Sequence, residues 1–298
     1  MKKIAILGST GMIGSGVTEV LAKFDQNLYE LNRTGIAVVK GNNYSKFMIE
    51  DDISILEKNL KGIDYVINAT GVIRHKIISN NPISVENAIK INSNFPKSLT
   101  ELSTILGFRI IQVATDCVYS GNKGSYSETD SFDPIDVYGQ TKASGEISHP
   151  NLLNLRVSVV GRELFTSVEL LSWVLSHSNN ASINGFSNHI WNGVTVLQLS
   201  KLINGIINND YFTPGTHHLI PSGKVSKYEL IKLIADLGDR SDITVDSASA
   251  DIKVDRTLAT NEINRNKTYW NLAGYTSIPT IEDMIAEYMG LTDQTNHL

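Results

Sequence analysis

The chain has 298 residues, of which 41% are hydrophobic and 19% charged, with a formal net charge of −5. This composition is typical of a globular protein that buries one large core or two smaller ones. It argues against a nucleic-acid partner, which needs clustered basic residues, and no apolar run is long enough to span a membrane. A single cysteine, Cys117, excludes an intramolecular disulfide. We therefore expect a cytoplasmic protein, and one without a metal site, because the seven histidines form no ligand cluster.

The first predicted unit is a strand, a glycine turn and a helix. Lys3–Leu7 is apolar, residues 8–14 read Gly-Ser-Thr-Gly-Met-Ile-Gly, and apolar residues then recur at helical spacing up to Phe24. This order is typical of a dinucleotide site, in which the helix N-terminus faces the pyrophosphate. A glycine-rich turn without a ligand is the alternative. The predicted cofactor-binding residues of this unit are Gly8, Thr10, Gly11, Met12, Ile13 and Gly14.

The second predicted strand, near Leu28–Leu31, ends in Asn32-Arg33. NAD sites carry an acidic residue here for the ribose 2′-hydroxyl, whereas NADP sites use a nearby arginine. Asn32 and Arg33 therefore favour NADP(H) over NAD(H). A solvated Arg33 is the alternative, and Glu30 is the acid that would reverse the preference.

Further cofactor contacts are predicted from the next two strands. Lys46–Glu50 is a candidate third strand, with Asp51 or Asp52 at its end near the adenine. Tyr65–Ala69 is the fourth strand, and backbone of Ala69, Thr70 and Gly71 should pass close to the cofactor. A long helix around Val85–Leu106 carries Asn92, which either braces the active-site strand, near the cofactor, or satisfies a local carbonyl.

Ile110–Ala114 and Leu152–Val160 are the fifth and sixth predicted strands. Strands that alternate with helical patterns predict an α/β fold with a doubly wound parallel sheet of the Rossmann type. Ligands bind such sheets outside the carboxyl ends of the strands. Gly8, Thr70 and Thr115 all fall at that edge.

The candidate catalytic residues are Thr115, Tyr138 and Lys142. Tyr138 and Lys142 are four residues apart on a predicted helix and so share one face. The same spacing recurs at Tyr228/Lys232, so it proves little alone. Thr115 at a strand end distinguishes the first pair, since a hydroxyl, a phenol and an ammonium together suit proton transfer to a carbonyl. We interpret Tyr228 as structural.

The regular alternation stops after Gly161. We predict a helix over Phe165–His177, another over Val196–Ile207 that rejoins the sheet, and a capping box at Ser226. These boundaries divide the chain into a Rossmann domain, 1–162, rejoined by about 190–212, and a smaller C-terminal α/β substrate-binding region formed by 163–189 and 213–298.

The motifs together resemble the extended short-chain dehydrogenase/reductases. Within that superfamily the chain looks most like the dTDP-4-dehydrorhamnose reductase branch, on the evidence of Thr115-Asp116, Tyr119, Gly121, Asp133-Pro134 and Tyr138 to Lys142. The resemblance implies an NADPH-dependent reductase of a nucleotide-linked 4-keto-6-deoxyhexose, an activity of polysaccharide biosynthesis. Its partner would be the nucleotide sugar, and a homodimer stays open.

The resemblance also implies roles for particular residues. Tyr138 would donate the proton, Thr115 would hydrogen-bond the same oxygen, and Lys142 would lower the pKa of Tyr138 and hold the nicotinamide ribose. The substrate-side residues would be Thr115, Asp116, Cys117, Trp191 and Arg256. Cys117 departs from the aromatic residue usual in that branch, and core packing is the alternative for Trp191.

Three other functions compete with this interpretation. The dehydratases of the superfamily carry a glutamate where this chain has Cys117, so elimination of water is disfavoured. An epimerase would hold NAD permanently, which Arg33 and the neutral Asn32 argue against. A non-catalytic regulatory subunit would keep the fold, but we expect such a subunit to have lost part of the set formed by Thr115, Tyr138 and Lys142.

Overall fold

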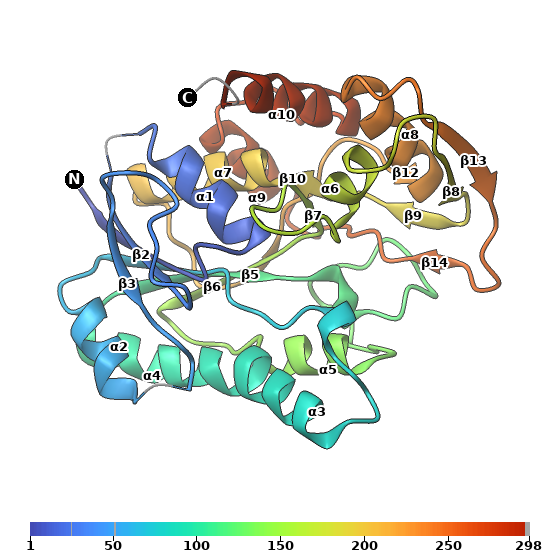
Figure 1. Cartoon of the computed structure of the whole chain (residues 1–298). Coiled ribbons are helices and arrows are strands. Elements are labelled where there is room, and N and C mark those ends of the chain that lie inside the picture. Colours follow the sequence, from blue (N-terminus) through green and yellow to red (C-terminus); the bar gives the residue numbers. More distant parts are fainter. Residues whose placement is uncertain (25, 51, 296–298) are drawn as a thin grey trace.

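The computed structural model describes residues 1–24, 26–50 and 52–295. A seven-stranded parallel sheet in the order β11-β6-β5-β4-β1-β2-β3 crosses its centre (Figure 1). The predicted α/β doubly wound sheet is confirmed. Its strands are β1 (Lys3–Leu7), β2 (Asn27–Asn32), β3 (Asn43–Lys46), β4 (Tyr65–Asn68), β5 (Arg109–Ala114), β6 (Leu152–Arg156) and β11 (Gly215–His218).

Helices cover both faces of this sheet (Figure 1). Alternation along β1 sends Ile4 and Ile6 into one apolar core and Ala5 and Leu7 into the other. On the first face lie α1 (Met12–Leu21), α7 (Val196–Asn208), α9 (Ile263–Leu272) and α10 (Ile281–Thr295). On the second face lie α2 (Ile53–Leu60), α3 (Pro82–Ile89), the π-helical turn η2 (Lys90–Asn94), α4 (Phe95–Leu106) and α5 (Val137–Ser144).

The long helix predicted over Val85–Leu106 is interrupted. The π-helical turn η2 joins α3 to α4, with helical backbone on both sides. One widened turn rotates the residues after it relative to those before it, and such turns are frequent at functional sites. Asn92 lies within η2 and is buried.

Two predicted strands differ from those observed. The third strand was expected at Lys46–Glu50 but is β3, which ends where that range begins. The sixth was expected to continue to Val160, whereas β6 ends at Arg156 and β7 (Val159–Val160) pairs with β10 (Val194–Thr195) instead. The helix predicted over Phe165–His177 is the shorter α6 (Leu170–Leu175).

The remaining elements form the smaller part of the molecule. Ser226 and Glu229 form the predicted capping box at the start of α8. The elements are β8 (Ser182–Phe186) with β13 (Thr244–Ala248), β9 (His189–Trp191) between β12 (Val225–Ser226) and β14 (Val254–Asp255), α8 (Lys227–Leu237), and the 3-10 turns η1 (Arg74–Lys76) and η3 (Asp116–Val118).

The main sheet takes its last strand from a segment that we assigned to the substrate-binding region. β11 comes after position 213, yet it pairs with β6 in register Gly215↔Leu153 to His218↔Arg156. The strand is short and polar, so its sequence contains no apolar run that would predict it. Its pairing with β6 makes it the last strand of the main sheet. No helix in the described part of the chain is both long enough and apolar enough to cross a membrane.

Candidate active site

The glycine turn after β1 brings α1 into close contact with the strand. Gly8 has φ +77°, which favours glycine, and a Cβ at Gly14 would lie 2.1 Å from the Gly8 carbonyl oxygen. Gly11 is the exposed N-cap of α1, and no side chain caps that helix end. The first N–H groups of α1 therefore remain available, and together with the helix dipole they fit an anionic cofactor group.

Near the end of β2, two polar side chains are buried and hydrogen-bonded, and a third is exposed to solvent. Asn32 is buried, and its amide donates to Ser9 Oγ at 2.8 Å and to the Ile36 carbonyl at 2.8 Å. Glu30 is also buried, and its carboxylate accepts hydrogen bonds from the backbone N–H of Val38 and Val39 and from Asn42. Arg33 is exposed to solvent. The side chains of Asn32 and Glu30 are therefore already occupied by internal hydrogen bonds, whereas the side chain of Arg33 is accessible to a ligand at this edge of the sheet.

The segment after β4 lies against the glycine turn. A Cβ at Gly8 would lie 3.2 Å from the Ala69 carbonyl oxygen and 3.3 Å from Thr70 Cα. A Cβ at Gly71 would lie 3.5 Å from Asn92 Oδ1 and 4.0 Å from Lys142 Nζ. The predicted cofactor residues from β1 and β4 and the candidate catalytic residue Lys142 are thus brought together at one sheet edge.

Asn92 joins this segment to α5, the helix that carries the candidate catalytic residues Tyr138 and Lys142. Its amide accepts from Val72 N–H (2.9 Å) and donates to the Val72 carbonyl (3.0 Å) and to Thr141 Oγ1 (3.0 Å). Asn92 therefore links the segment after β4 to α5, which is neither the contact with the active-site strand nor the local carbonyl that the sequence analysis offered. Of the two aspartates expected near the adenine, Asp52 caps α2 by accepting from Ser54 N–H, and Asp51 lies outside the described residues.

Thr115, Tyr138 and Lys142 meet beyond the carboxyl end of β5. The Thr115 hydroxyl donates to Asp116 Oδ1 and accepts from Cys117 N–H, both at 3.2 Å. It also hydrogen-bonds the Tyr138 side chain. Lys142 Nζ donates to the Val113 carbonyl at 3.2 Å, one residue before the end of the strand.

The pKa values at this site differ from our expectation. Burial raises the pKa of Tyr138, Cys117 adds to the rise, and the hydrogen bond with Thr115 opposes it. Burial also lowers the pKa of Lys142. We expected Lys142 to lower the pKa of Tyr138, but removal of the phenol from water is the largest influence and raises that pKa. The phenol therefore keeps its proton at neutral pH, as a proton donor must.

Two glycines allow α5 to pack closely against neighbouring backbone. A Cβ at Gly139, next to Tyr138, would lie 2.2 Å from the Cys117 carbonyl oxygen. A Cβ at Gly145 would lie 2.0 Å from the Asn92 carbonyl oxygen. Both neighbours are backbone, so α5 reaches its position only because these residues lack side chains.

The substrate-side residues surround η3. Burial raises the pKa of Asp116, and the positive charges of Arg256 and Lys227 oppose this. Burial raises the pKa of the Cys117 thiol to about 12, so it stays neutral. Trp191 is only 4% exposed and belongs to the hydrophobic core. Its position therefore agrees with the predicted alternative of core packing and not with a substrate contact.

The sequence agrees with a known protein family. The family's model, described as the RmlD substrate binding domain, matches residues 1–257. The chain belongs to this family. Our assignment to the dTDP-4-dehydrorhamnose reductase-like branch of the extended short-chain dehydrogenase/reductases is thereby confirmed.

Relatives of this RmlD-family chain carry two kinds of name. The chain is 26% identical over 257 residues to the methionine adenosyltransferase 2 subunit beta of Bos taurus, covering 79% of this chain and 72% of that protein. It is 29% identical over 147 residues to the dTDP-4-dehydrorhamnose reductase of Aggregatibacter actinomycetemcomitans, covering 49% and 46%. The structure of the dTDP-4-dehydrorhamnose reductase of Bacillus anthracis in complex with NADP superposes with a TM-score of 0.75 at 17% identity, covering 98% and 100%.

Sequence reasoning missed several charged residues of this RmlD-family site. Lys227 acts electrostatically on Asp116 from the start of α8. Arg156 and Glu146 form an ion pair in which each side chain is only 2% exposed, directly behind α5. Arg156 and Glu146 are charged residues next to predicted core segments in the sequence. A charge in such a place usually needs a partner, and this is the signal that could have identified them. Lys227 carried no such signal.

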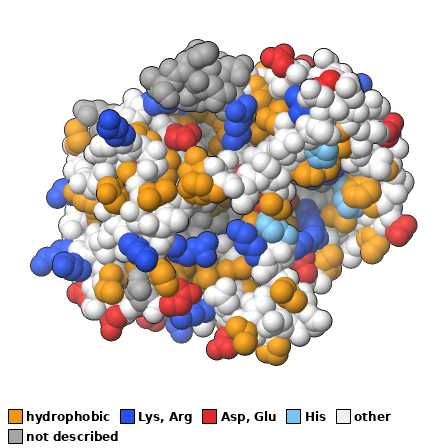
Figure 2. All heavy atoms as spheres, viewed as in Figure 1, with side chains coloured by type: hydrophobic (Ala, Val, Ile, Leu, Met, Phe, Trp, Pro, Cys, Tyr) orange, Lys and Arg blue, Asp and Glu red, His pale blue; other side chains and the backbone are white. Residues whose placement is uncertain are grey.

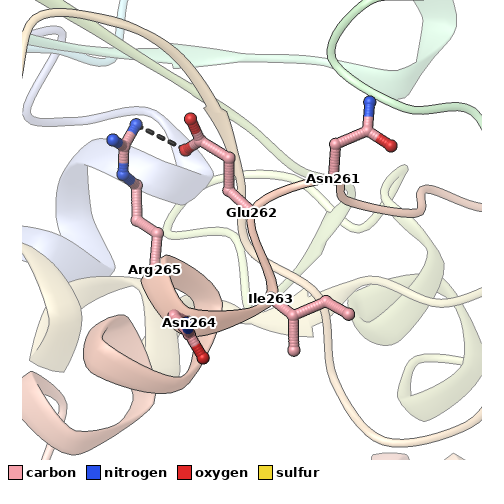
Figure 3. A pocket seen from close by; sticks show the side chains of 5 residues that line it. All are labelled: Asn261, Glu262, Ile263, Asn264 and Arg265. Atoms are coloured by element: carbon pink, nitrogen blue, oxygen red, sulfur yellow. Dashed lines mark ion pairs between the residues drawn. The ribbon is translucent and has the colours of Figure 1, made fainter.

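Two cavities of this RmlD-family protein are lined by none of the candidate catalytic residues. The larger, about 550 Å³, is lined by Asn261, Glu262, Ile263, Asn264 and Arg265 at the start of α9 (Figure 3). There Arg265 pairs with Glu262 at 2.5 Å. The smaller, about 310 Å³, lies among residues of α2, η2 and α4, next to β3. The candidate site is therefore defined by its chemistry and its sheet edge rather than by these cavities.

Proposed function

We propose that this protein is an NADPH-dependent reductase of a nucleotide-linked 4-keto-6-deoxyhexose. The observation that carries the proposal is the meeting of Thr115, Tyr138 and Lys142 at the carboxyl end of β5, beside the glycine turn of α1. Membership of the RmlD substrate binding domain family and the related dTDP-4-dehydrorhamnose reductase support it.

The residues divide the work of carbonyl reduction. Tyr138, which burial keeps protonated, donates its proton to the oxygen of the reduced carbonyl. The Thr115 hydroxyl, which accepts from Cys117 N–H, turns its proton from Asp116 to the same oxygen when the substrate binds, and so stabilises and positions that oxygen. Lys142 lies one turn after Tyr138 on α5, and its positive charge stabilises the phenolate left after proton transfer. When bound, NADPH supplies the hydride.

The preference for NADPH rests on the end of β2. The carboxylate of Glu30, the acid on β2 that could bind a ribose 2′-hydroxyl, is held by the backbone of Val38 and Val39. Asn32 holds the following turn and Ser9. Arg33 is exposed and cationic, which suits a 2′-phosphate. Arg33→Ser should therefore weaken NADPH binding and leave NADH binding little changed.

The decisive experiment compares the wild-type chain with Tyr138→Phe. Consumption of NADPH, with NADH alongside, is followed over a panel of nucleotide-linked 4-keto-6-deoxy sugars. We expect Tyr138→Phe to lose at least about a hundredfold in kcat, the usual contribution of a general acid, while it still binds NADPH. Tyr228→Phe, the second tyrosine with a lysine four residues on, is the matched control and should retain wild-type activity. A folded Tyr138→Phe with unchanged turnover would rule out this mechanism.

A regulatory subunit is the second candidate function. The relative from Bos taurus that covers 79% of this chain is named as a subunit of methionine adenosyltransferase, which favours this alternative. The test is size-exclusion chromatography of the chain with and without a methionine adenosyltransferase catalytic subunit, followed by the activity of that subunit. A stable complex with altered activity, together with no turnover on the sugar panel, would replace the reductase proposal.

A further inference from the structure

A carboxylate follows the tyrosine and lysine of α5 with the same spacing. Tyr138, Lys142 and Glu146 are each four residues apart. Glu146 lies in the turn that continues the chain beyond Ser144, the last residue of α5, and its N–H donates to the Ala143 carbonyl at 3.2 Å. Because residues four apart on a helix share one face, the acid follows the phenol and the ammonium along the same side of α5.

The Glu146 carboxylate is buried and ionised. Its two oxygens accept hydrogen bonds from Arg156 Nε at 3.2 Å and Nη2 at 2.6 Å, and each side chain of the pair is 2% exposed. Burial raises the pKa of Glu146, and the charge and hydrogen bonds of Arg156 oppose this. Since a guanidinium only donates and does not lose its proton, both carboxylate oxygens act as acceptors, which is the ionised form of the acid.

The Glu146 side chain lies beneath the open surface. Figure 2 shows a hollow across the middle of one face, with Lys and Arg side chains gathered along it, whereas the Glu146 side chain is almost fully enclosed. The turn that carries it is also fixed, because the Gly145 carbonyl accepts from Gln112 Nε2 at 2.8 Å and a Cβ at Gly145 would lie 2.0 Å from the Asn92 carbonyl oxygen. Any effect of this carboxylate on a bound ligand must therefore pass through a neighbouring group.

The neighbouring group is Lys142, whose Nζ donates to the Val113 carbonyl at 3.2 Å. Burial lowers the pKa of Lys142, and Glu146 and then Cys117 oppose this decrease. Burial raises the pKa of the Cys117 thiol to about 12, so the thiol is neutral near pH 7 and the negative charge comes from Glu146. Burial also raises the pKa of Tyr138. As the pH rises, Lys142 therefore loses its proton before the phenol does.

We propose that Glu146 is a positioning residue, which holds Lys142 in its charged form beside Tyr138 and so maintains proton transfer as the pH rises. The inference rests on the proposed function, because it concerns how Lys142 serves Tyr138 in carbonyl reduction. The phenolate left after transfer is stabilised by Lys142 only while that residue carries its charge. Arg156 has a supporting part, since it keeps Glu146 ionised where water does not reach the carboxylate.

The test measures the charge of Lys142 directly, by NMR of the full chain labelled with isotope-enriched lysine. The Nζ signal of Lys142, assigned by its absence from Lys142→Met, is followed from neutral to alkaline pH. Glu146→Gln keeps the shape of the side chain and an acceptor for Arg156 but removes the negative charge. We expect the midpoint of the Lys142 titration to fall by about 1 pH unit, the lower end of the effect of a close opposite charge. Glu146→Asp keeps the charge and should titrate near the wild-type value.

A second readout is the dependence of kcat/KM on pH, with a keto sugar that the wild type reduces. Its alkaline limb should move to lower pH in Glu146→Gln by the same amount as the Lys142 midpoint. Glu287→Gln is the matched control, because Glu287 pairs with Lys201 between α10 and α7 and its loss weakens packing elsewhere. It should leave both readouts unchanged. If Glu146→Gln does not fold, the double variant Glu146→Leu/Arg156→Met replaces the buried pair by apolar side chains and should lower the midpoint likewise.

Two outcomes would overturn the inference. One is an equal Lys142 midpoint in the wild type and in Glu146→Gln. The other is an activity of Glu146→Gln that falls by the same factor at every pH, which is what a merely structural role predicts. The proposed function fails separately: a Lys142 titration that depends on Glu146, with no reduction of any keto sugar, would reject the reductase and leave the coupling of the two charges standing. Reduction by Glu146→Gln with an unchanged pH profile would reject only the inference.

Discussion

At the scale of single residues, Arg156 at the end of β6 joins several buried side chains. Its guanidinium binds both carboxylate oxygens of Glu146 at 3.2 and 2.6 Å and donates to Tyr119 Oη at 2.8 Å. It also lies 2.8 Å from His218 Nε2, while His218 Nδ1 lies 2.7 Å from the Ala259 carbonyl. Since a carbonyl only accepts and a guanidinium only donates, His218 is neutral with its proton on Nδ1.

The neutral state of His218 predicts how stability depends on pH. Burial and the charge of Arg156 lower the pKa of His218 to about 4, whereas in the unfolded chain it lies near 6.5. As the pH falls from 6.5 to 4, His218 binds a proton in the unfolded chain but stays neutral in the folded chain. Stability should therefore fall by up to about 3 kcal/mol through this window. Urea unfolding at pH 7, 5.5 and 4.5 measures it.

The comparison for this prediction is His218→Asn, whose side chain donates to the same carbonyl but does not titrate. Its stability should decline less steeply between pH 6.5 and 4.5 than that of the wild type. Parallel declines in the two proteins would show that other groups carry the acid sensitivity.

The candidate catalytic residues could be singled out from the sequence because each has a local signal. Thr115 ends an apolar strand, Tyr138 and Lys142 share a helix face, and the glycines follow β1 directly. Lys227 could not be predicted, because its place beside Asp116 depends on β12 pairing with β9, a contact between segments far apart in the chain. For Trp191, core packing was the favoured prediction over a substrate contact, and its burial in the core agrees with that.

At the scale of elements, contacts between backbones decide where the functional helices lie. Gly14 sets the distance between α1 and β1, so Gly14→Ala should push α1 from the sheet or unfold the chain. Because the neighbouring atoms are backbone of Gly8 and Ser9 and cannot turn away, we expect a loss of several kcal/mol in the free energy of unfolding. Nothing lies within 4 Å of a Cβ at Gly290 in α10, so Gly290→Ala should be neutral or stabilising by about 0.5–1 kcal/mol.

Chemical denaturation of the two variants, with NADPH titrated into each, separates these cases. Gly14→Ala should also lose NADPH affinity, since α1 presents its N-terminus to the proposed cofactor site. An unchanged midpoint and affinity for Gly14→Ala would contradict the tight packing described here.

The elements that could not be predicted share a physical cause. The turn η2 has the same i, i+4 apolar pattern as an ordinary helix, so one extra residue in a turn leaves no mark on the sequence. β11 is short and polar, and only its pairing with β6 makes it a strand. The strands with apolar or β-branched runs, β1, β2, β4, β5 and β6, were predicted at or near their observed positions, because burial on both faces requires such residues.

At the scale of the whole molecule, one hydrophobic core joins the sheet to the smaller part. The same cluster contains Ile4 of β1, Leu230 of α8 and Met284 of α10. The two predicted regions should therefore unfold together, with calorimetric and van't Hoff enthalpies that agree. Leu230→Ala removes a fully buried side chain and should lower the free energy of unfolding by about 2–5 kcal/mol, while unfolding remains a single transition. Two separate transitions in a scan of the wild type would contradict a shared core.

The place of β11 also has a consequence for biosynthesis. About sixty residues separate the end of β6 from the start of β11. At translation rates of roughly 5–20 residues per second, a nascent chain carries β6 as an unpaired edge for roughly 3–12 s. An exposed apolar strand edge is a template for aggregation. Newly made molecules of this protein should therefore depend on ribosome-associated chaperones during that interval, and slow codons between β6 and β11 should lower the yield of folded protein.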